Sequence, residues 1–403
     1  MQTSIPAQLL SHPDIAEADA ILRSCVHCGF CNATCPTYQL LGSELDGPRG
    51  RIYLIKEMLE TGQASDKTRL HLDRCLTCRA CETTCPSGVR YGRLIDIGRE
   101  MAEVRAPRSL SARLLRKAML AVLPYTARIS VALALARVFR PLLPLHLQKK
   151  IPARQTASIT PATLHSRRML VLQGCIQPLS TPNTNAAAAR VLDRLGISLI
   201  SAPGAGCCGA LNQHLADPEG ARAMMRRNID AWWPHVENGA EAIVMTASGC
   251  GLMVKDYVAA LKDDTKYADK AARISELTRD LSEILNRENL NTFAHIGRGM
   301  RVAYQSSCTL QHGQKLGGTV EAILQRCGYE LSPVADSHLC CGAAGTYTLL
   351  QAELSRQLLK NKLAALHEGK PEVIASANVG CQMHLASASD LPVKHWIELL
   401  EQN

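Results

Sequence analysis

Residues 25–36 read CVHCGFCNATCP, and residues 75–86 repeat the same pattern as CLTCRACETTCP. Each stretch has the spacing C-x2-C-x2-C-x3-C-P, which is typical of proteins that hold two [4Fe–4S] clusters. Three thiolates separated by two residues can wrap one corner of a cubane cluster, and the fourth cysteine, followed by proline, ligates the other cluster. The spacing therefore predicts one cluster on Cys25, Cys28, Cys31 and Cys85, and another on Cys75, Cys78, Cys81 and Cys35.

A pair of zinc knuckles is the competing interpretation of these eight cysteines. Zinc needs only two C-x2-C pairs per site and does not require the doubled eight-cysteine pattern. The spacing therefore favours clusters over zinc. Between the two motifs, DGPRGRIYLIKEMLETG (46–62) reads as a loop that enters a helix, so we expect a mostly helical domain.

The 17 cysteines of the 403-residue chain form two groups with a long gap between them. Eight lie between residues 25 and 85, and nine lie between residues 175 and 381. The gap ends in PARQTASITPATLHS, a composition typical of a linker. We therefore divide the chain into a two-cluster ferredoxin-like domain (1–103), a basic amphipathic helical segment with its linker (104–166) and two cysteine-rich halves (167–297 and 298–403).

The N-terminus, MQTSIPAQLLSHPDIAEADAIL, carries acidic residues and lacks the basic start and apolar block of a secretory signal peptide. Disulfides would need an oxidising compartment. We therefore interpret the thiols as reduced metal ligands and expect a cytoplasmic location.

The two cysteine-rich halves repeat one another with an offset of 133 residues. Cys175 and Cys207 have their counterparts in Cys308 and Cys340, and in both halves the second of these opens a Cys-Cys-Gly sequence. The neighbouring stretches VLDRLGISLI (191–200) and ILQRCGYELS (323–332) also match in pattern, at an offset of 132 residues. A further cysteine follows each pair, in TASGCG and in ANVGCQ. The repeat predicts two structures of the same kind.

Each cysteine site in the two halves follows a short apolar run, as in RRMLVLQ before Cys175 and ISLISAP before Cys207. Helical patterns such as ELSRQLLKNKLAALHEG lie between these runs. Strands that alternate with helices predict a parallel α/β unit, in which ligands gather beyond the carboxyl ends of the strands. The overall prediction is an α+β multidomain protein, with the helical domain followed by two repeated α/β halves.

Four thiolates in each half suit an iron–sulfur cluster or tetrahedral zinc equally well. Both possibilities stay open for these sites, which we call the CCG sites. The predicted ligands are Cys175, Cys207, Cys208 and Cys250 in the first half, and Cys308, Cys340, Cys341 and Cys381 in the second.

The stretch GAGCCGA (204–210) also fits the dinucleotide fingerprint G-x-G-x-x-G. Its counterpart SHLCCGAAG (337–345) keeps the two cysteines and loses the first two glycines. The halves thus share a thiol pair and not a phosphate cradle. A reactive dithiol is disfavoured as well, because adjacent cysteines form strained disulfides.

Three further side chains near these motifs need an interpretation. Cys327 lies in an apolar pattern opposite Leu195 of the other half, so we assign it to the core. His312 and His384 follow cysteines by four and three residues, but the first half has no equivalent of either. We therefore leave both histidines out of the ligand sets.

The positive charge of the chain is concentrated in one segment. Residues 104–168 hold 13 of the 45 Lys and Arg residues and none of the 36 Asp and Glu residues. With only 4% aromatic residues in the chain, this distribution excludes a general nucleic-acid-binding surface. We predict that the segment faces an acidic partner or an anionic membrane, against the alternative of a solvated helical linker.

The tandem eight-cysteine module followed by two CCG repeats resembles a family of iron–sulfur subunits. That family includes subunits of glycolate oxidase, anaerobic glycerol-3-phosphate dehydrogenase and heterodisulfide reductase. The stretches between the cysteines are most similar to the glycolate oxidase type over nearly the whole chain. They include ADAILRSCVHCGFCNATCPTYQLLGSELDGPRGRIYLIK, HLDRCLTCRACETTCPSGVRYG, NTNAAAARVLDRLGIS, RNIDAWWP, DSHLCCGAAGTY and ANVGCQMHLASA.

The resemblance implies a non-catalytic electron-transfer subunit. Flavin-containing partner subunits would oxidise glycolate to glyoxylate, and this chain would relay single electrons to a membrane acceptor such as quinone. The location would then be cytoplasmic, or peripheral on the cytoplasmic face of the inner membrane. Related 2-hydroxy-acid or glycerol-3-phosphate dehydrogenases are the alternative parent complexes.

One departure from the heterodisulfide-reductase motif concerns the last cysteine of each half. In that motif the last cysteine belongs to a C-x2-C pair, whereas Ala247 and Asn378 occupy the earlier position here. Each half therefore lacks a fifth thiol. This difference argues against a thiol–disulfide reductase, and a zinc-stabilised docking scaffold remains possible for the CCG halves.

Overall fold

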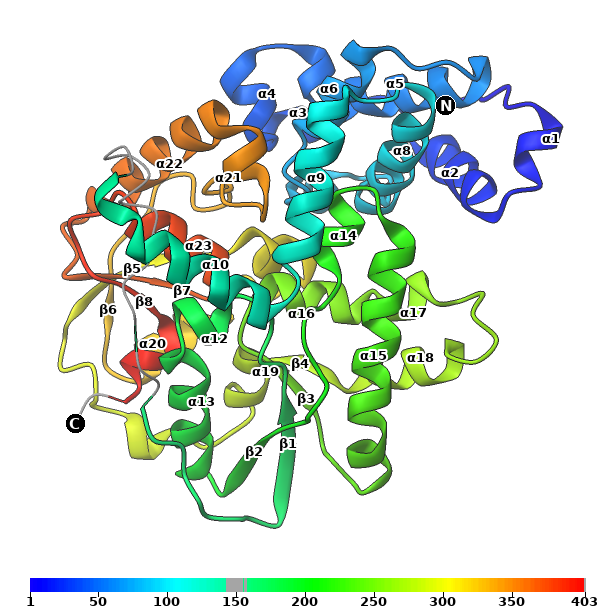
Figure 1. Cartoon of the computed structure of the whole chain (residues 1–403). Helices are drawn as coiled ribbons and strands as arrows, with labels where there is room; N and C mark the ends of the chain where they lie inside the picture. The colour runs from blue at the N-terminus through cyan, green and yellow to red at the C-terminus, as the bar shows by residue number, and fades with distance from the viewer. Residues whose placement is uncertain (143–154, 156–157, 402–403) are drawn as a thin grey trace.

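The structure is a computed structural model that describes residues 1–142, 155 and 158–401. Its N-terminal domain is helical, and two parallel sheets follow it in the chain (Figure 1). The basic residues Lys149, Lys150 and Arg154 and part of the predicted linker lie outside the described residues.

The N-terminal domain is built from short helices that begin and end at recognisable residues. Pro13, Pro36 and Pro48 each occupy the first position of a helix, where the missing N–H of proline costs nothing. Gly42 and Gly62 end two helices in the left-handed conformation. The helices are α1 (Ala7–Leu10), α2 (Pro13–Ser24), α3 (Phe30–Ala33), α4 (Pro36–Leu41), α5 (Pro48–Thr61), α6 (Asp66–Asp73), α7 (Ala80–Thr84) and α8 (Tyr91–Arg105).

Three of these helices bury apolar stripes against one another and form the core of the domain. Leu22 of α2, Ile55 of α5 and Leu94 of α8 are fully buried in it. Cys25, Cys75 and several other cysteines pack at the edge of the same cluster. The core therefore holds the two cysteine motifs next to each other.

Two helices connect this domain to the sheets. They are α9 (Leu110–Val122) and α10 (Thr126–Val138), and they are bent by 110° relative to each other. Figure 1 shows α9 running down from the N-terminal helices and α10 running from there toward the left of the view.

The first half contains a four-stranded parallel sheet of order β2-β1-β3-β4. Helices connect consecutive strands, as parallel pairing requires. The strands are β1 (Arg167–Val171), β2 (Ile197–Ser201), β3 (Ile243–Met245) and β4 (Thr278–Asp280). The helices are α12 (Gln177–Ser180), α13 (Asn183–Asp193), α14 (Ala210–His214), α15 (Pro218–Glu237), α16 (Ser248–Lys255), α17 (Tyr257–Ala260), α18 (Ala268–Leu277) and α19 (Leu281–Leu285).

The second half repeats this topology with the order β6-β5-β7-β8. Its strands are β5 (Arg301–Gln305), β6 (Glu330–Leu331), β7 (Val373–Ser376) and β8 (Val393–His395). Its helices are the π-helical turn η4 (Thr309–Gly313), α20 (Thr319–Arg326), α21 (Tyr347–Leu350), α22 (Ala352–His367), α23 (Val379–Ala386) and α24 (Trp396–Leu399).

The two halves share one hydrophobic core. Met169 and Val244 of the first sheet belong to the same buried cluster as Val302 and Tyr304 of the second. Cys327 is fully buried in this cluster, as the sequence pattern predicts. The predicted fold class is confirmed: a mostly helical domain precedes two repeated α/β halves.

Candidate metal centres

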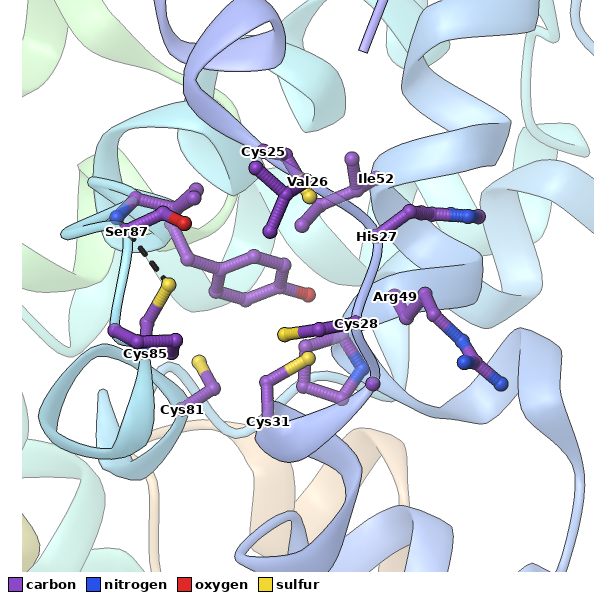
Figure 2. Close-up of a pocket in the computed structure, with 15 residues that line it drawn as sticks. Cys25, Val26, His27, Cys28, Cys31, Arg49, Ile52, Cys81, Cys85 and Ser87 are labelled. Carbon is purple, nitrogen blue, oxygen red and sulfur yellow. Dashed lines mark hydrogen bonds between the residues drawn. The ribbon is translucent and has the colours of Figure 1, made fainter.

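The first candidate centre, site 1, is a hollow lined by Cys25, Cys28 and Cys31 of the first motif and by Cys81 and Cys85 of the second. The cavity at its centre has a volume of about 30 Å³. Figure 2 shows the sulfur atoms of Cys28, Cys31 and Cys85 turned into it, with Cys25 on its rim. Burial, followed by the neighbouring thiols of Cys25, Cys85 and Cys28, raises the pKa of Cys31 to about 11. The four thiols of the first predicted set are thus brought together.

Site 1 reaches the surface of the molecule. Cys28 is exposed, whereas Cys31 and Cys85 are half-buried and Cys25 is buried. The apolar neighbours Val26 and Phe30 are 67% and 61% exposed. A thiol donor set that is open on one side suits a group that exchanges electrons with something outside the chain.

The second candidate centre, site 2, lies deeper. Its four cysteines are all buried. Burial raises the pKa of Cys81 well above its ordinary value, and the neighbouring thiols of Cys78, Cys75 and Cys35 raise it further. Cys35 comes from the first motif in the chain, yet it faces the thiols of the second motif. The crossed assignment of these eight cysteines to two clusters stays a prediction.

Two arginines support the backbone and the thiols of site 2. Arg51 is 1% exposed, and its Nη1 lies 4.0 Å from Cys35 Sγ. Burial lowers the pKa of Arg51, but nearby Tyr91, Cys75, Cys35 and Asp46 outweigh this effect and raise it overall. Arg99 donates to the carbonyl of Cys75 at 2.6 Å. Positively charged side chains and N–H hydrogen-bond donors near the thiolates stabilise a negatively charged cluster.

The two motifs also share an unusual backbone conformation. Gly29 and its counterpart Arg79 both have positive φ, at 87° and 59°. His27 and its counterpart Thr77 do so as well, at 60° and 54°. Left-handed residues between the cysteines turn the chain back on itself. This turn lets consecutive cysteines of one motif face a common centre.

The CCG site of the second half is a row of four thiols in contact. Cys308 Sγ lies 3.9 Å from Cys340 Sγ. Hydrogen bonds from the thiols of Cys308 and Cys341 lower the pKa of Cys340, and a hydrogen bond from the Cys341 thiol lowers the pKa of Cys381. The structure thus gathers all four predicted cysteines of this half at the carboxyl end of its sheet.

The CCG site of the first half has the same arrangement. Hydrogen bonds from the thiols of Cys175 and Cys208 lower the pKa of Cys207. Cys208 in turn lies beside Cys250. In both halves, therefore, the first cysteine of the adjacent pair is the one held most strongly in the thiolate form.

The glycine of each Cys-Cys-Gly sequence is required by the backbone. Gly209 and Gly342 have φ of +93° and +89°. A Cβ on Gly342 would lie 2.8 Å from the carbonyl oxygen of Ser355, and one on Gly209 would lie 3.1 Å from that of Ala221. Only glycine permits both the left-handed turn and this close approach to the following helix.

A buried or partly buried basic side chain lies near the thiols of each half. In the first half, the guanidinium of Arg227 packs on Gly206 and contributes to the lowered pKa of Cys207. In the second half, Lys362 is 4% exposed, and its Nζ donates to the carbonyl of Asp336 at 2.9 Å. Burial lowers the pKa of Lys362, while the nearby thiols of Cys341 and Cys340 raise it. Both cations can compensate part of the negative charge of four thiolates.

Site 2 is in direct contact with the second CCG site. Cys78 packs in one buried cluster with Cys340, Tyr347 and Leu358. The hydroxyl of Tyr347 donates to the carbonyl of Arg74 at 3.1 Å across the same boundary. The predicted ligands Cys78 and Cys340 thus lie in one cluster, and the two sites are neighbours.

The two CCG sites also meet each other. The hydroxyls of Ser248 and Thr309 lie 2.8 Å apart. Asn378 accepts from the backbone N–H of Gly249 at 3.3 Å and donates from Nδ2 to Cys381 Sγ at 3.5 Å. Asn378 thus occupies the position of the absent fifth thiol and joins the two sites.

His312 and His384, which we left out of the predicted ligand sets, each lie within hydrogen-bond distance of other groups. The two ring nitrogens of His312 lie 3.1 Å from Thr83 Oγ1 and 2.9 Å from the carbonyl of His338. His384 Nε2 lies 3.2 Å from Ser355 Oγ. Within the part of the chain that the structure describes, no three His, Cys, Asp or Glu side chains are arranged to hold a single metal ion.

Sequence reasoning missed the residues around the thiols. Arg51, Arg99 and Lys362 lie far from the cysteines in the chain and belong to no spacing motif. Arg227 and Lys362 are separated by 135 residues and not by the repeat offset of 133, so the repeat does not reveal the pair.

Comparison with known families and proteins agrees with this geometry. Residues 21–89 match the 4Fe-4S dicluster domain, and residues 169–255 and 302–386 match the cysteine-rich domain. The chain is 56% identical over all 403 residues to the glycolate oxidase iron–sulfur subunit of Escherichia coli K12, of which it covers 99%.

More distant relatives share parts of the same organisation. Over 90% of its length the chain is 29% identical to the probable glycolate oxidase iron–sulfur subunit of Bacillus subtilis 168, covering 88% of that protein. Over 56% of its length it is 25% identical to lactate utilization protein A of the same organism, covering 95% of that protein. The chain therefore belongs to the family of glycolate oxidase iron–sulfur subunits.

Proposed function

We propose that this chain relays single electrons from the flavin-containing subunits of a glycolate oxidase complex to a quinone at the membrane. One [4Fe–4S] cluster would be held by the four cysteines of site 1 and another by those of site 2. The observation that carries the proposal is a row of neighbouring thiols: Cys81 of the buried site 2 lines the hollow of the exposed site 1, and Cys78 lies in one buried cluster with Cys340 of the second CCG site.

The donor sets fit the clusters that the proposal requires. Each N-terminal site presents four cysteine sulfurs, the ligands that [4Fe–4S] clusters use. When bound, such a cluster accepts and releases one electron at a time. Arg51 and the backbone N–H of Thr77, which lies 3.4 Å from Cys75 Sγ, provide positive charge and hydrogen bonding at site 2. The residues of the chain thus hold, bury and electrostatically tune the centres.

Electrons would enter at site 1. Cys28 is the exposed member of the eight N-terminal cysteines, and the exposed side chains of Val26, Phe30 and Tyr53 lie close to it in the chain or on the neighbouring helix α5. Exposed apolar side chains around a redox site are suited to docking a partner protein. The flavin-bearing subunit is the partner we assign to this surface.

The CCG sites would extend the path if they hold iron, and they would serve as structural elements if they hold zinc. The two outcomes differ in the metal content of the chain purified without oxygen. The N-terminal sites account for about 8 Fe per chain. Iron clearly above this amount without zinc assigns clusters to the CCG sites, whereas about 8 Fe confines electron transfer to the N-terminal domain.

The test of function is glycolate-dependent reduction of a quinone analogue by the membrane-bound complex. We expect the activity to be lost without this chain and in the variant Cys81→Ala, while the chain with Cys327→Ala retains it. Equal quinone reduction with and without the chain would overturn the proposal. Parallel assays with lactate and glycerol 3-phosphate identify the parent complex, since only the correct substrate supports reduction.

A thiol–disulfide reductase is the second candidate function. The four thiols of each half contact one another, and Asn378 occupies the position of a fifth. A substrate disulfide would therefore find no additional cysteine there. Disulfide reduction by the isolated chain would restore this candidate.

A further inference from the structure

Helices α9 and α10 expose an unusual amount of apolar surface. Seven of the eighteen exposed large apolar residues in the described chain lie on these two helices or directly after them. They are Leu110, Leu114, Leu115, Val131, Leu135, Val138 and Phe139, with exposed fractions between 52% and 75%. A cluster of this kind on a protein surface marks an interaction site.

The exposed residues follow the helical period. On α9, Leu110 and Leu114 are four residues apart, and on α10, Val131, Leu135 and Val138 follow at intervals of four and three. Each helix also has a side that faces the protein, where Met119 and Ile129 are buried. Each helix is therefore apolar both toward the protein and toward the outside.

Basic side chains surround this apolar surface. Arg113, Lys117, Arg128 and Arg140 are exposed, and residues 104–168 contain no acidic residue. Arg116 of α9 and Arg108, just before α9, both pair with Asp73 of α6 and so hold α9 against the N-terminal domain. The outward charge of the surface is therefore of one sign.

No single described helix is long and apolar enough to cross a membrane, although α9 and α10 together pass the same length and composition test despite their 110° bend. If these helices bound another protein, their exposed surface would be expected to carry charges of both signs and to be enriched in aromatic residues. Here the exposed residues are mostly aliphatic and every charge is positive. These properties match the headgroup region of an anionic bilayer, where apolar side chains enter and Lys and Arg meet lipid phosphates.

We propose that α9 and α10 form a docking surface that lies on an anionic lipid bilayer. This inference goes beyond the proposed function, because it holds whichever acceptor receives the electrons. It also orients the molecule. Thr126 at the start of α10 donates to the carbonyl of Cys175 at 3.1 Å, so the docked helix touches the loop that carries a thiol of the first CCG site.

The test is co-sedimentation of the full, iron-loaded chain with lipid vesicles. We expect binding to vesicles of phosphatidylcholine mixed with phosphatidylglycerol, and little binding to phosphatidylcholine alone. The double variant Leu114→Glu/Leu135→Glu should weaken binding by at least about tenfold. The double variant Arg113→Gln/Lys117→Gln should weaken it by about tenfold and reduce its dependence on salt.

The control is Leu349→Glu, which places the same charge at a 57% exposed leucine on α21. This variant should bind vesicles as the unmodified chain does. Iron content and circular dichroism establish that each variant is folded.

Vesicle binding that is absent, or that neither double variant weakens, would overturn the proposal. So would a loss of flavin-subunit association with unchanged vesicle binding, because a protein would then cover this surface. Quinone reduction in detergent solution tests the proposed function separately.

Discussion

At the scale of single residues, Lys360 serves as a matched control for testing the role of Lys362. Both lie on α22, but Lys360 is exposed and Lys362 is 4% exposed behind the thiols of the second CCG site. Residues that support metal ligands typically contribute 10–100-fold to metal affinity. We therefore expect Lys362→Met to accelerate metal loss from that site by about tenfold during a chelator challenge. Lys360→Met should behave as the unmodified chain, and equal loss from both variants would contradict the role.

Glu100 predicts a pH dependence of stability. Burial, aided by the carboxylate of Asp96, raises its pKa to about 7, while Gln213 donates to it at 2.9 Å from the first CCG half. The folded chain therefore holds this proton more tightly than the unfolded chain. Its stabilising contribution is complete below about pH 4.5, falls as the pH rises and is lost above about pH 7.

We expect Glu100→Gln to remove this dependence. Above pH 7 the variant should exceed the unmodified chain in free energy of unfolding by about 1–2 kcal/mol. Melting temperatures measured from pH 5 to pH 8 check this expectation, with the exposed Glu57→Gln as control. A variant that loses stability above pH 7 would show that the carboxylate is stabilising instead.

Cysteine spacing and an internal repeat are local signals, so the sequence alone groups sixteen cysteines into four candidate sites, and their role as ligands stays a prediction. It could not predict Glu100 or Lys362. Their environments arise only when helices distant in the chain pack together. No spacing rule connects Glu100 with Gln213, which lies 113 residues away.

At the scale of elements, the crossed use of the two motifs is testable by double substitution. Cys35 belongs to the first motif and directly precedes helix α4, yet its thiol contributes to the raised pKa of Cys78 and of Cys81 in the second motif. Cys35→Ala/Cys78→Ala should therefore remove one cluster and leave about 4 Fe in the N-terminal domain. Cys35→Ala/Cys28→Ala should remove both. Iron analysis giving the reverse pattern would mean that each motif holds its own cluster.

The strands that precede cysteines were predictable, since each is a short apolar run before a marked position. The sequence reading missed β4 and β8, which add to the sheets without leading to a cysteine. Each has three residues, and β4 reads Thr-Arg-Asp. Their strand conformation comes from pairing with β3 and β7 and not from their own composition.

At the scale of the whole molecule, the domains should respond differently to iron removal. Helices α3 and α7 have four and five residues, too few to be stable alone, and they carry or adjoin cluster cysteines. The two sheets share a core that contains no N-terminal residue. Anaerobic chelation should therefore accelerate hydrogen exchange in α3 and α7 and leave β1 and β5 protected. Equal deprotection of both regions would indicate a single cooperative unit.

The sequence could not predict which CCG half adjoins site 2, because both halves carry the same cysteine pattern. The choice depends on side chains outside that pattern. Tyr347 and Leu358 pack against Cys78, whereas the repeat position of Tyr347 in the first half is His214. Domain docking is thus decided by residues in which the two copies differ.

The openness of site 1 has a consequence for biogenesis. The sulfur that faces solvent is the one that dioxygen or peroxide reaches first, and Cys28 is the exposed thiol of the eight. A newly made chain that waits without its partner is therefore most vulnerable at the point where we propose that the partner binds. Early association with that partner would shield the centre from oxidative damage, so cells benefit when the subunits are synthesised together and in matched amounts.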